Sequence, residues 1–109
     1  MSYNVLSIPS FDREFKRLAK KFPSLKKDLT ELSNLLEEDP QQGTPLGRNC
    51  FKIRMAITSK GKGKSGGARV ITNIVITESN VYLISIYDKS ERENISPNEL
   101  NELLKNIPR

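Results

Sequence analysis

Large apolar residues at helical spacing form one stripe over residues 11–22 and a second over residues 25–36. Each stripe predicts an amphipathic helix, because positions three and four apart lie on one helix face. Pro23 ends the first helix, Ser24 can cap the second, and Asp39-Pro40 ends it. The pattern therefore predicts a helical hairpin in the first third of the chain.

Beyond residue 50 the hydrophobic period changes from 3.6 to 2. Apolar residues alternate with polar or small ones over residues 51–58, which predicts a half-buried strand. Further strands are predicted over residues 3–8, 68–77 and 81–87. A capping box, Ser96-Pro-Asn-Glu99, predicts a final helix that ends before Pro108.

These elements follow in the order β-α-α-β-β-β-α, and 109 residues are enough for one domain, residues 1–109. Three strands with short connections predict a small antiparallel sheet of the α+β class. We expect the two N-terminal helices and the C-terminal helix to cover one face. Gln41–Gly47 is interpreted as a turn-rich connector.

Charge is distributed unevenly. The formal net charge is +5, yet residues 40–77 contain no Asp or Glu and seven cations: Arg48, Lys52, Arg54, Lys60, Lys62, Lys64 and Arg69. Such cations repel one another unless an anion supplies the missing partner, and a phosphate backbone is the natural one. A solvated Lys/Gly loop with no partner is the alternative for the lysines of residues 59–67.

Strand alternation places Lys52 and Arg54 side by side on the face opposite the helices. Arg69 joins them only if the register of its strand allows it. Alternatively, Lys52 and Arg54 could simply lie on the solvent-exposed face of a half-buried strand and have no function. Arg69 could instead pair with an acid such as Glu78 or Asp88.

The chain has no histidine and one cysteine, Cys50. This excludes Ser-His-Asp and Cys-His catalysis and an internal disulfide. Gly61–Gly66 matches G-x-G-x-x-G by letter, but a strand rather than a helix follows it, which argues against a dinucleotide site. No signal peptide or apolar run long enough for a membrane is recognisable, so we expect a cytoplasmic protein without membrane contact.

Arginine and lysine can nevertheless assist metal-free cleavage of RNA by its own 2′-hydroxyl. Arginine clamps the dianionic phosphorane, and lysine transfers protons if crowding among cations lowers its pKa. The candidate catalytic residues are Lys52, Arg54, Arg69 and Lys89, with no metal ligands and no cofactor. Tyr87 fits a core position as well as a base-stacking platform.

The runs FKIRMAITSKGKGKSGGARVI and VYLISIYDKSERENIS resemble toxins of the RelE/ParE superfamily, in its HigB-like or RelE-like branch. The resemblance implies a RelE-like fold and an mRNA interferase that inhibits translation by cleaving mRNA on the ribosome. It also implies a cognate antitoxin of helix-turn-helix or ribbon-helix-helix type. Operator DNA would be bound only through the antitoxin complex.

By the same resemblance the family's functional cations fall on Lys52, Arg54, Arg69 and Lys89. Contacts to RNA or the ribosome are expected from the following five residues: Arg48, Lys60, Lys62, Lys64 and Tyr87. Ser90 and Ser96 stand where RelE has an arginine and a tyrosine, so the general base is left open among Lys52, Tyr87 and Lys89. Two other functions are left open: a ParE-like inhibitor of DNA gyrase, and an inactive ribosome- or RNA-binding module.

Overall fold

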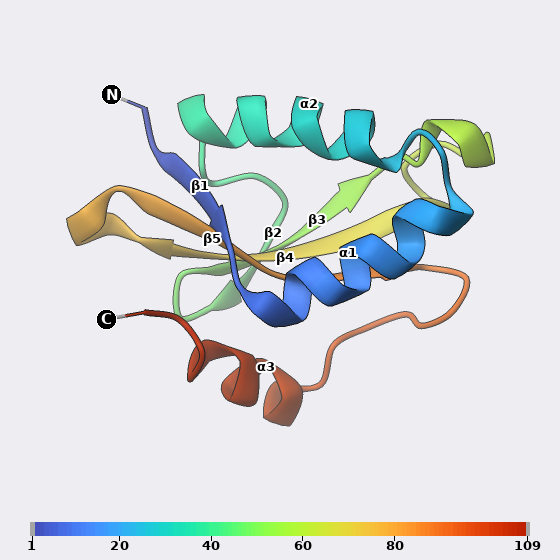
Figure 1. Ribbon diagram of the computed structural model, residues 1–109. Coiled ribbons are helices and arrows are strands. Elements are labelled where there is room, and N and C mark those ends of the chain that lie inside the picture. The colour runs from blue at the N-terminus through green and yellow to red at the C-terminus, as the bar shows by residue number, and fades with distance from the viewer. Residues whose placement is uncertain (1, 109) are drawn as a thin grey trace.

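The computed structural model describes residues 2–108 and has one mixed sheet with helices on both of its faces (Figure 1). The strand order is β1-β5-β4-β3-β2. The helices and strands are β1 (Asn4–Ser7), α1 (Pro9–Lys21), α2 (Leu25–Glu38), β2 (Thr44–Gly47), β3 (Cys50–Met55), β4 (Ala68–Val75), β5 (Asn80–Asp88) and α3 (Pro97–Leu104). Two short 3-10 helices, η1 (Thr58–Lys60) and η2 (Ile76–Glu78), follow β3 and β4.

The predicted α+β class is confirmed, and so is the antiparallel meander of β3, β4 and β5. The prediction of a purely antiparallel sheet is wrong at one edge, where β1 runs parallel to β5. At the other edge, the predicted connector contains the short strand β2, which pairs antiparallel with β3. Four residues that include a proline and a glycine carry no hydrophobic alternation, so no pattern could indicate this strand.

The turn between β2 and β3 explains how so short a strand can pair. Arg48 and Asn49 have φ angles of 57° and 61°, which is the backbone required at both central positions of a type I′ hairpin turn. Gly43 lets β2 approach β3 closely, since a Cβ at this position would lie 2.3 Å from the carbonyl oxygen of Lys52.

The helices do not cover a single face, contrary to the sequence-based expectation. α1 and α2 bury their apolar stripes on one face, where Phe11, Leu18 and Leu36 are at most 2% exposed. α3 lies on the opposite side of the sheet from α2 (Figure 1). Its start agrees with the prediction, because the Ser96 hydroxyl accepts a hydrogen bond from the Glu99 N–H at 3.1 Å.

α3 therefore shares its face of the sheet with the cations of β3 and covers only part of it. Within residues 2–108, no helix has the length and apolar character required to cross a membrane.

Candidate functional site

The register of β3 and β4 brings the predicted cations together. Arg54 lies directly opposite Arg69, and Lys52 is two residues before Arg54 on the same face. The uncertainty about Arg69 is thereby resolved, because its side chain points to the same side of the sheet as the other two.

These side chains line a pocket of about 220 Å³ together with Lys89, in the turn after β5. All four predicted catalytic residues thus border one small space, although they come from three separate segments of the chain. Thr44, Glu93 and Asn94 complete the lining. The Lys89 N–H donates to the Gly67 carbonyl at 3.0 Å, which fixes the turn against the start of β4.

Arg69 is held by backbone rather than by an acid. Its guanidinium donates to the carbonyl oxygens of Lys64 at 3.0 Å, Ala68 at 3.2 Å and Ser65 at 3.3 Å. It is only 4% exposed, so it is buried although it points to the same side of the sheet as Lys52 and Arg54. Pairing with Glu78 or Asp88 is contradicted. Arg69 therefore ties the end of the Lys/Gly loop to the floor of the pocket.

The other two strand cations are more accessible. Lys52 Nζ donates to the side-chain oxygen of Asn94 at 3.0 Å. Arg54 is exposed and makes no hydrogen bond or ion pair through its guanidinium to any other residue between 2 and 108. An arginine without an internal partner retains all five of its N–H donors for an external anion.

Lys60 differs from the rest of the acid-free segment. Its ammonium contacts Asp88 Oδ1 and Ser90 Oγ, both at 2.6 Å, and lies 5.8 Å from the ring centre of Phe22. The side chains of Lys60 and Asp88 are 12% and 1% exposed. Asp88 follows Tyr87 on β5, so its side chain points to the opposite face of the sheet, the one covered by α1 and α2, and away from the pocket. The prediction that Lys60 contacts RNA is not supported.

Burial alone would raise the pKa of the Asp88 carboxyl. The hydrogen bonds from Lys60 and from the Ser90 N–H outweigh burial, and the pKa of Asp88 is lowered from its usual value. The ionised form is therefore the one that this ion pair stabilises.

A second buried acid, Asp28 of α2, was missed by sequence reasoning. It accepts hydrogen bonds from Thr58 Oγ1 at 2.6 Å, the Thr58 N–H at 3.0 Å and Ser24 Oγ at 2.8 Å. These contacts attach η1 to α2, just as Lys60 attaches it to β5. The sequence feature that could have indicated this buried acid is the position of Asp28 beside the apolar stripe of its helix.

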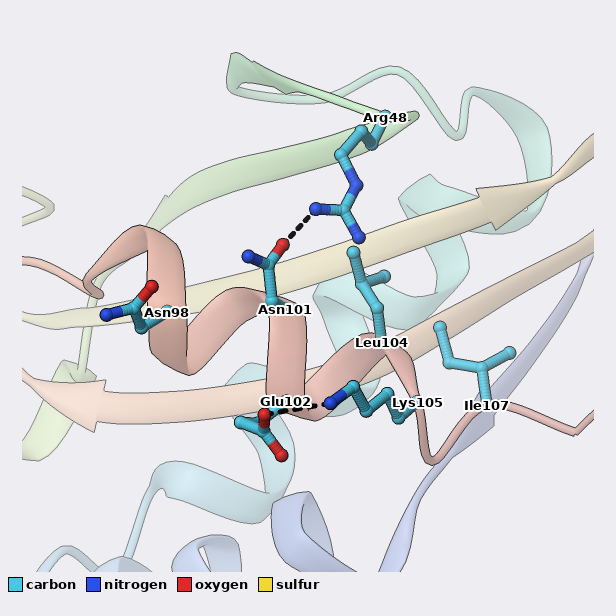
Figure 2. A pocket seen from close by; sticks show the side chains of 7 residues that line it. All are labelled: Arg48, Asn98, Asn101, Glu102, Leu104, Lys105 and Ile107. Atoms are coloured by element: carbon cyan, nitrogen blue, oxygen red, sulfur yellow. Dashed lines mark hydrogen bonds and ion pairs between the residues drawn. The ribbon is translucent and has the colours of Figure 1, made fainter.

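Tyr87 and Arg48 are not arranged as RNA contacts of the pocket. Tyr87 is 2% exposed, its hydroxyl donates to the Glu93 carbonyl at 3.4 Å, and the Arg92 guanidinium lies 4.9 Å from its ring centre. Its ring is thus unavailable to an RNA base, and burial raises the pKa of its phenol. Arg48 donates to Asn101 of α3 and lines a different, open depression of about 830 Å³ (Figure 2).

Lys62 and Lys64 are exposed, and their ammonium groups make no hydrogen bond or ion pair elsewhere in residues 2–108. Lys62 stands between the two anchored points of the loop, and the backbone carbonyl of Lys64 is one of those that Arg69 holds. In the same described range, no group of three His, Cys, Asp or Glu residues is placed to hold a metal ion.

The fold and the pocket together are those of a small α+β protein that has a cation-lined pocket on one face of a mixed sheet. The family described as "RelE toxin of RelE / RelB toxin-antitoxin system" matches residues 11–107. The chain therefore belongs to the RelE toxin family of toxin–antitoxin systems.

Two solved structures are similar to this fold. One is a mutant of the E. coli toxin RelE in the free state, with 18% identity, a TM-score of 0.67, and coverage of 99% of this chain and 100% of that chain. The other is the toxin–antitoxin complex RelBE2 from Mycobacterium tuberculosis, with 18% identity, a TM-score of 0.61, and coverage of 81% and 92%. At this identity both likenesses concern the fold.

Proposed function

We propose that this toxin is a metal-independent endoribonuclease that cleaves mRNA on the ribosome. The observation that carries the proposal is the pocket in which Lys52, Arg54, Arg69 and Lys89 converge. Four cations in a space of about 220 Å³ repel one another unless an anion enters. A single phosphodiester with its adjoining ribose is of a size and charge to fill such a pocket.

Each cation has a role that its surroundings support. Arg69 is buried and oriented, and Arg54 is accessible with unpaired donors, so together they can hold the non-bridging phosphate oxygens as negative charge develops. Lys52 and Lys89 border the same space and are ammonium donors, so either can protonate the leaving 5′-oxygen.

Dependence on the ribosome follows from what the pocket lacks. A pocket this small seats one phosphodiester. Tyr87 is buried, and among residues 2–108 no aromatic side chain lines the pocket to stack on single-stranded RNA. Lys62 and Lys64 on the exposed loop can instead contact ribosomal RNA phosphates, which tolerate imprecise geometry. We further propose a cognate antitoxin as protein partner, operator DNA binding only through that complex, and action in the cytoplasm.

The test is induction of the protein in bacteria, followed by mapping of mRNA 5′ ends. We expect growth arrest and new 5′ ends within coding regions. Arg54→Gln should abolish both, whereas Arg13→Gln, an exposed substitution on α1, should abolish neither. DNA breaks with intact mRNA would refute the proposal in favour of gyrase inhibition. Translational arrest with intact mRNA would refute it in favour of a non-cleaving ribosome-binding protein.

A further inference from the structure

One acidic residue borders the cation pocket. Glu93, in the segment between β5 and α3, is the single acid among its seven lining residues. Within residues 2–108 the Glu93 carboxylate makes no hydrogen bond and no ion pair. The neighbouring acids differ: Glu91 pairs with Arg17 at 2.9 Å, and Glu99 pairs with Arg92. Glu93 is thus the acid of this region that remains available.

The backbone around Glu93 is fixed although the segment has no regular secondary structure. The Tyr87 hydroxyl donates to the Glu93 carbonyl at 3.4 Å. Arg92 donates through Nε and Nη2 to the Asn94 carbonyl at 3.3 and 3.0 Å, and Lys52 donates to the Asn94 side chain. These contacts bind the residues on both sides of the Glu93 side chain, which limits how far the carboxylate can move from the pocket.

The other charged groups facing this space are Lys52 and Arg54 from β3, Arg69 from β4, and Lys89 from the turn after β5. An ammonium or guanidinium group has only donors and cannot accept a proton. A carboxylate has only acceptors when it is ionised. RNA cleavage needs one group of each kind, since one proton must be removed and another supplied.

We propose that Glu93 is the general base of the cleavage reaction, an inference that rests on the proposed function. The Glu93 carboxylate takes the proton of the 2′-hydroxyl while the 2′-oxygen forms a bond to phosphorus. The bond from phosphorus to the 5′-oxygen breaks, and a lysine ammonium, from Lys52 or Lys89, protonates that oxygen. The products are a 2′,3′-cyclic phosphate and a 5′-hydroxyl, with no oxidant, metal or further reactant.

The first experiment measures single-turnover cleavage of mRNA on programmed ribosomes at saturating toxin. Glu93→Gln should reduce the rate constant about 10²–10⁴-fold, the usual contribution of a general base, while ribosome affinity is kept. Glu93→Asp should recover part of the rate. The matched control is Glu91→Gln, which makes the same change of charge two residues away, and it should cleave as the wild type does.

The pH dependence gives a readout that a structural role would not move. If Glu93 rather than hydroxide takes the proton, the wild-type rate should not rise in proportion to hydroxide concentration between about pH 6 and 8. In Glu93→Gln, hydroxide must replace the base, and the residual rate should rise about tenfold per pH unit. A wild-type rate that rises tenfold per unit over this range would overturn the proposal and make a lysine the base.

The outcomes distinguish this proposal from the one it rests on. Cleavage by Glu93→Gln at the wild-type rate overturns the role of Glu93 and leaves the endoribonuclease standing. A wild-type protein that binds programmed ribosomes without cleaving refutes the endoribonuclease itself. Loss of ribosome binding by Glu93→Gln, with the rate at saturation unchanged, would also overturn the role as base.

Discussion

The cation pocket and the Lys60–Asp88 ion pair lie at the same end of the sheet but on opposite faces of it. Lys60 of the ion pair and three of the four pocket cations come from the acid-free residues 40–77, whereas Lys89 lies outside that segment. In the ion pair, Lys60 finds Asp88 at 2.6 Å, where both side chains are shielded from water. In the pocket, Arg54 and Arg69 face each other across two strands with no acid paired to either.

The comparison shows that one pattern of positive charge can serve two purposes. A buried lysine next to a carboxylate contributes to folding, because removing either partner leaves an uncompensated buried charge. Cations that converge without partners oppose folding and favour an external anion. The Lys60–Asp88 ion pair therefore holds the loop and the turn after β5 in place. The cations that line the pocket remain available to an external anion.

The sharpest way to test this division is to remove the buried lysine. Lys60→Met keeps a chain of similar size and leaves Asp88 buried and unpaired, so we expect a loss of about 3–5 kcal/mol in the free energy of unfolding. The control is Lys62→Met in the same loop, which should change it by no more than about 0.5 kcal/mol. The measurement is urea denaturation. Equal effects of the two substitutions would contradict the assignment.

On the pocket side, Arg54→Gln should act on cleavage and not on folding. Its guanidinium has no partner within the described residues, and loss of a transition-state ligand typically lowers the rate by about 10²–10³-fold. Single-turnover cleavage on programmed ribosomes measures the rate, and thermal melting measures the fold. A lowered melting temperature together with the lost activity would show that Arg54 also has a structural role.

The exposed lysines should have a smaller effect, confined to binding. Replacing Lys62 and Lys64 by Gln should weaken ribosome association and reduce the slope of log affinity against log salt concentration by about 1 for each phosphate that is no longer neutralised. The rate at saturation should not change. A cleavage titration at two salt concentrations tests this, and a double variant that is inactive at saturation would place one lysine in the catalytic step.

The smallest expected change is the loss of wild-type stability when Asp88 is protonated at low pH. The pKa of Asp88 is lowered in the folded protein, so its contribution is complete above the unfolded pKa of about 3.9 and is lost as pH falls through the lower folded value. Asp88→Asn should therefore have a lower free energy of unfolding than the wild type at pH 7, and this difference should become smaller below about pH 4. A difference in free energy of unfolding that does not change with pH would show that Asp88 contributes through packing and not through its charge.

Much of the fold could be read from hydrophobic spacing. The apolar stripes of α1 and α2, the alternation of β3 and the capping box of α3 each express a local rule, and each predicts its element. The predicted strand over residues 51–58 is too long, because β3 ends at Met55 and η1 begins at Thr58. The short strand β2 and the parallel pairing of β1 carry no such local signal. They exist because β3 and β5 offer unpaired edges at which a few residues can complete their hydrogen bonds.

The candidate site divides in the same way. The sequence by itself determined that seven cations would lie in one acid-free segment and that Lys52 and Arg54 would share a strand face. Only the tertiary structure decided which cation meets an acid, because Lys60 and Asp88 are 28 residues apart and charge has no periodicity that reveals a distant partner. The tertiary structure likewise decided that Arg69 faces Arg54, that Tyr87 is buried and that Glu93 borders the pocket. Strand register and the path of an irregular segment depend on packing across the whole sheet, which no local pattern reveals.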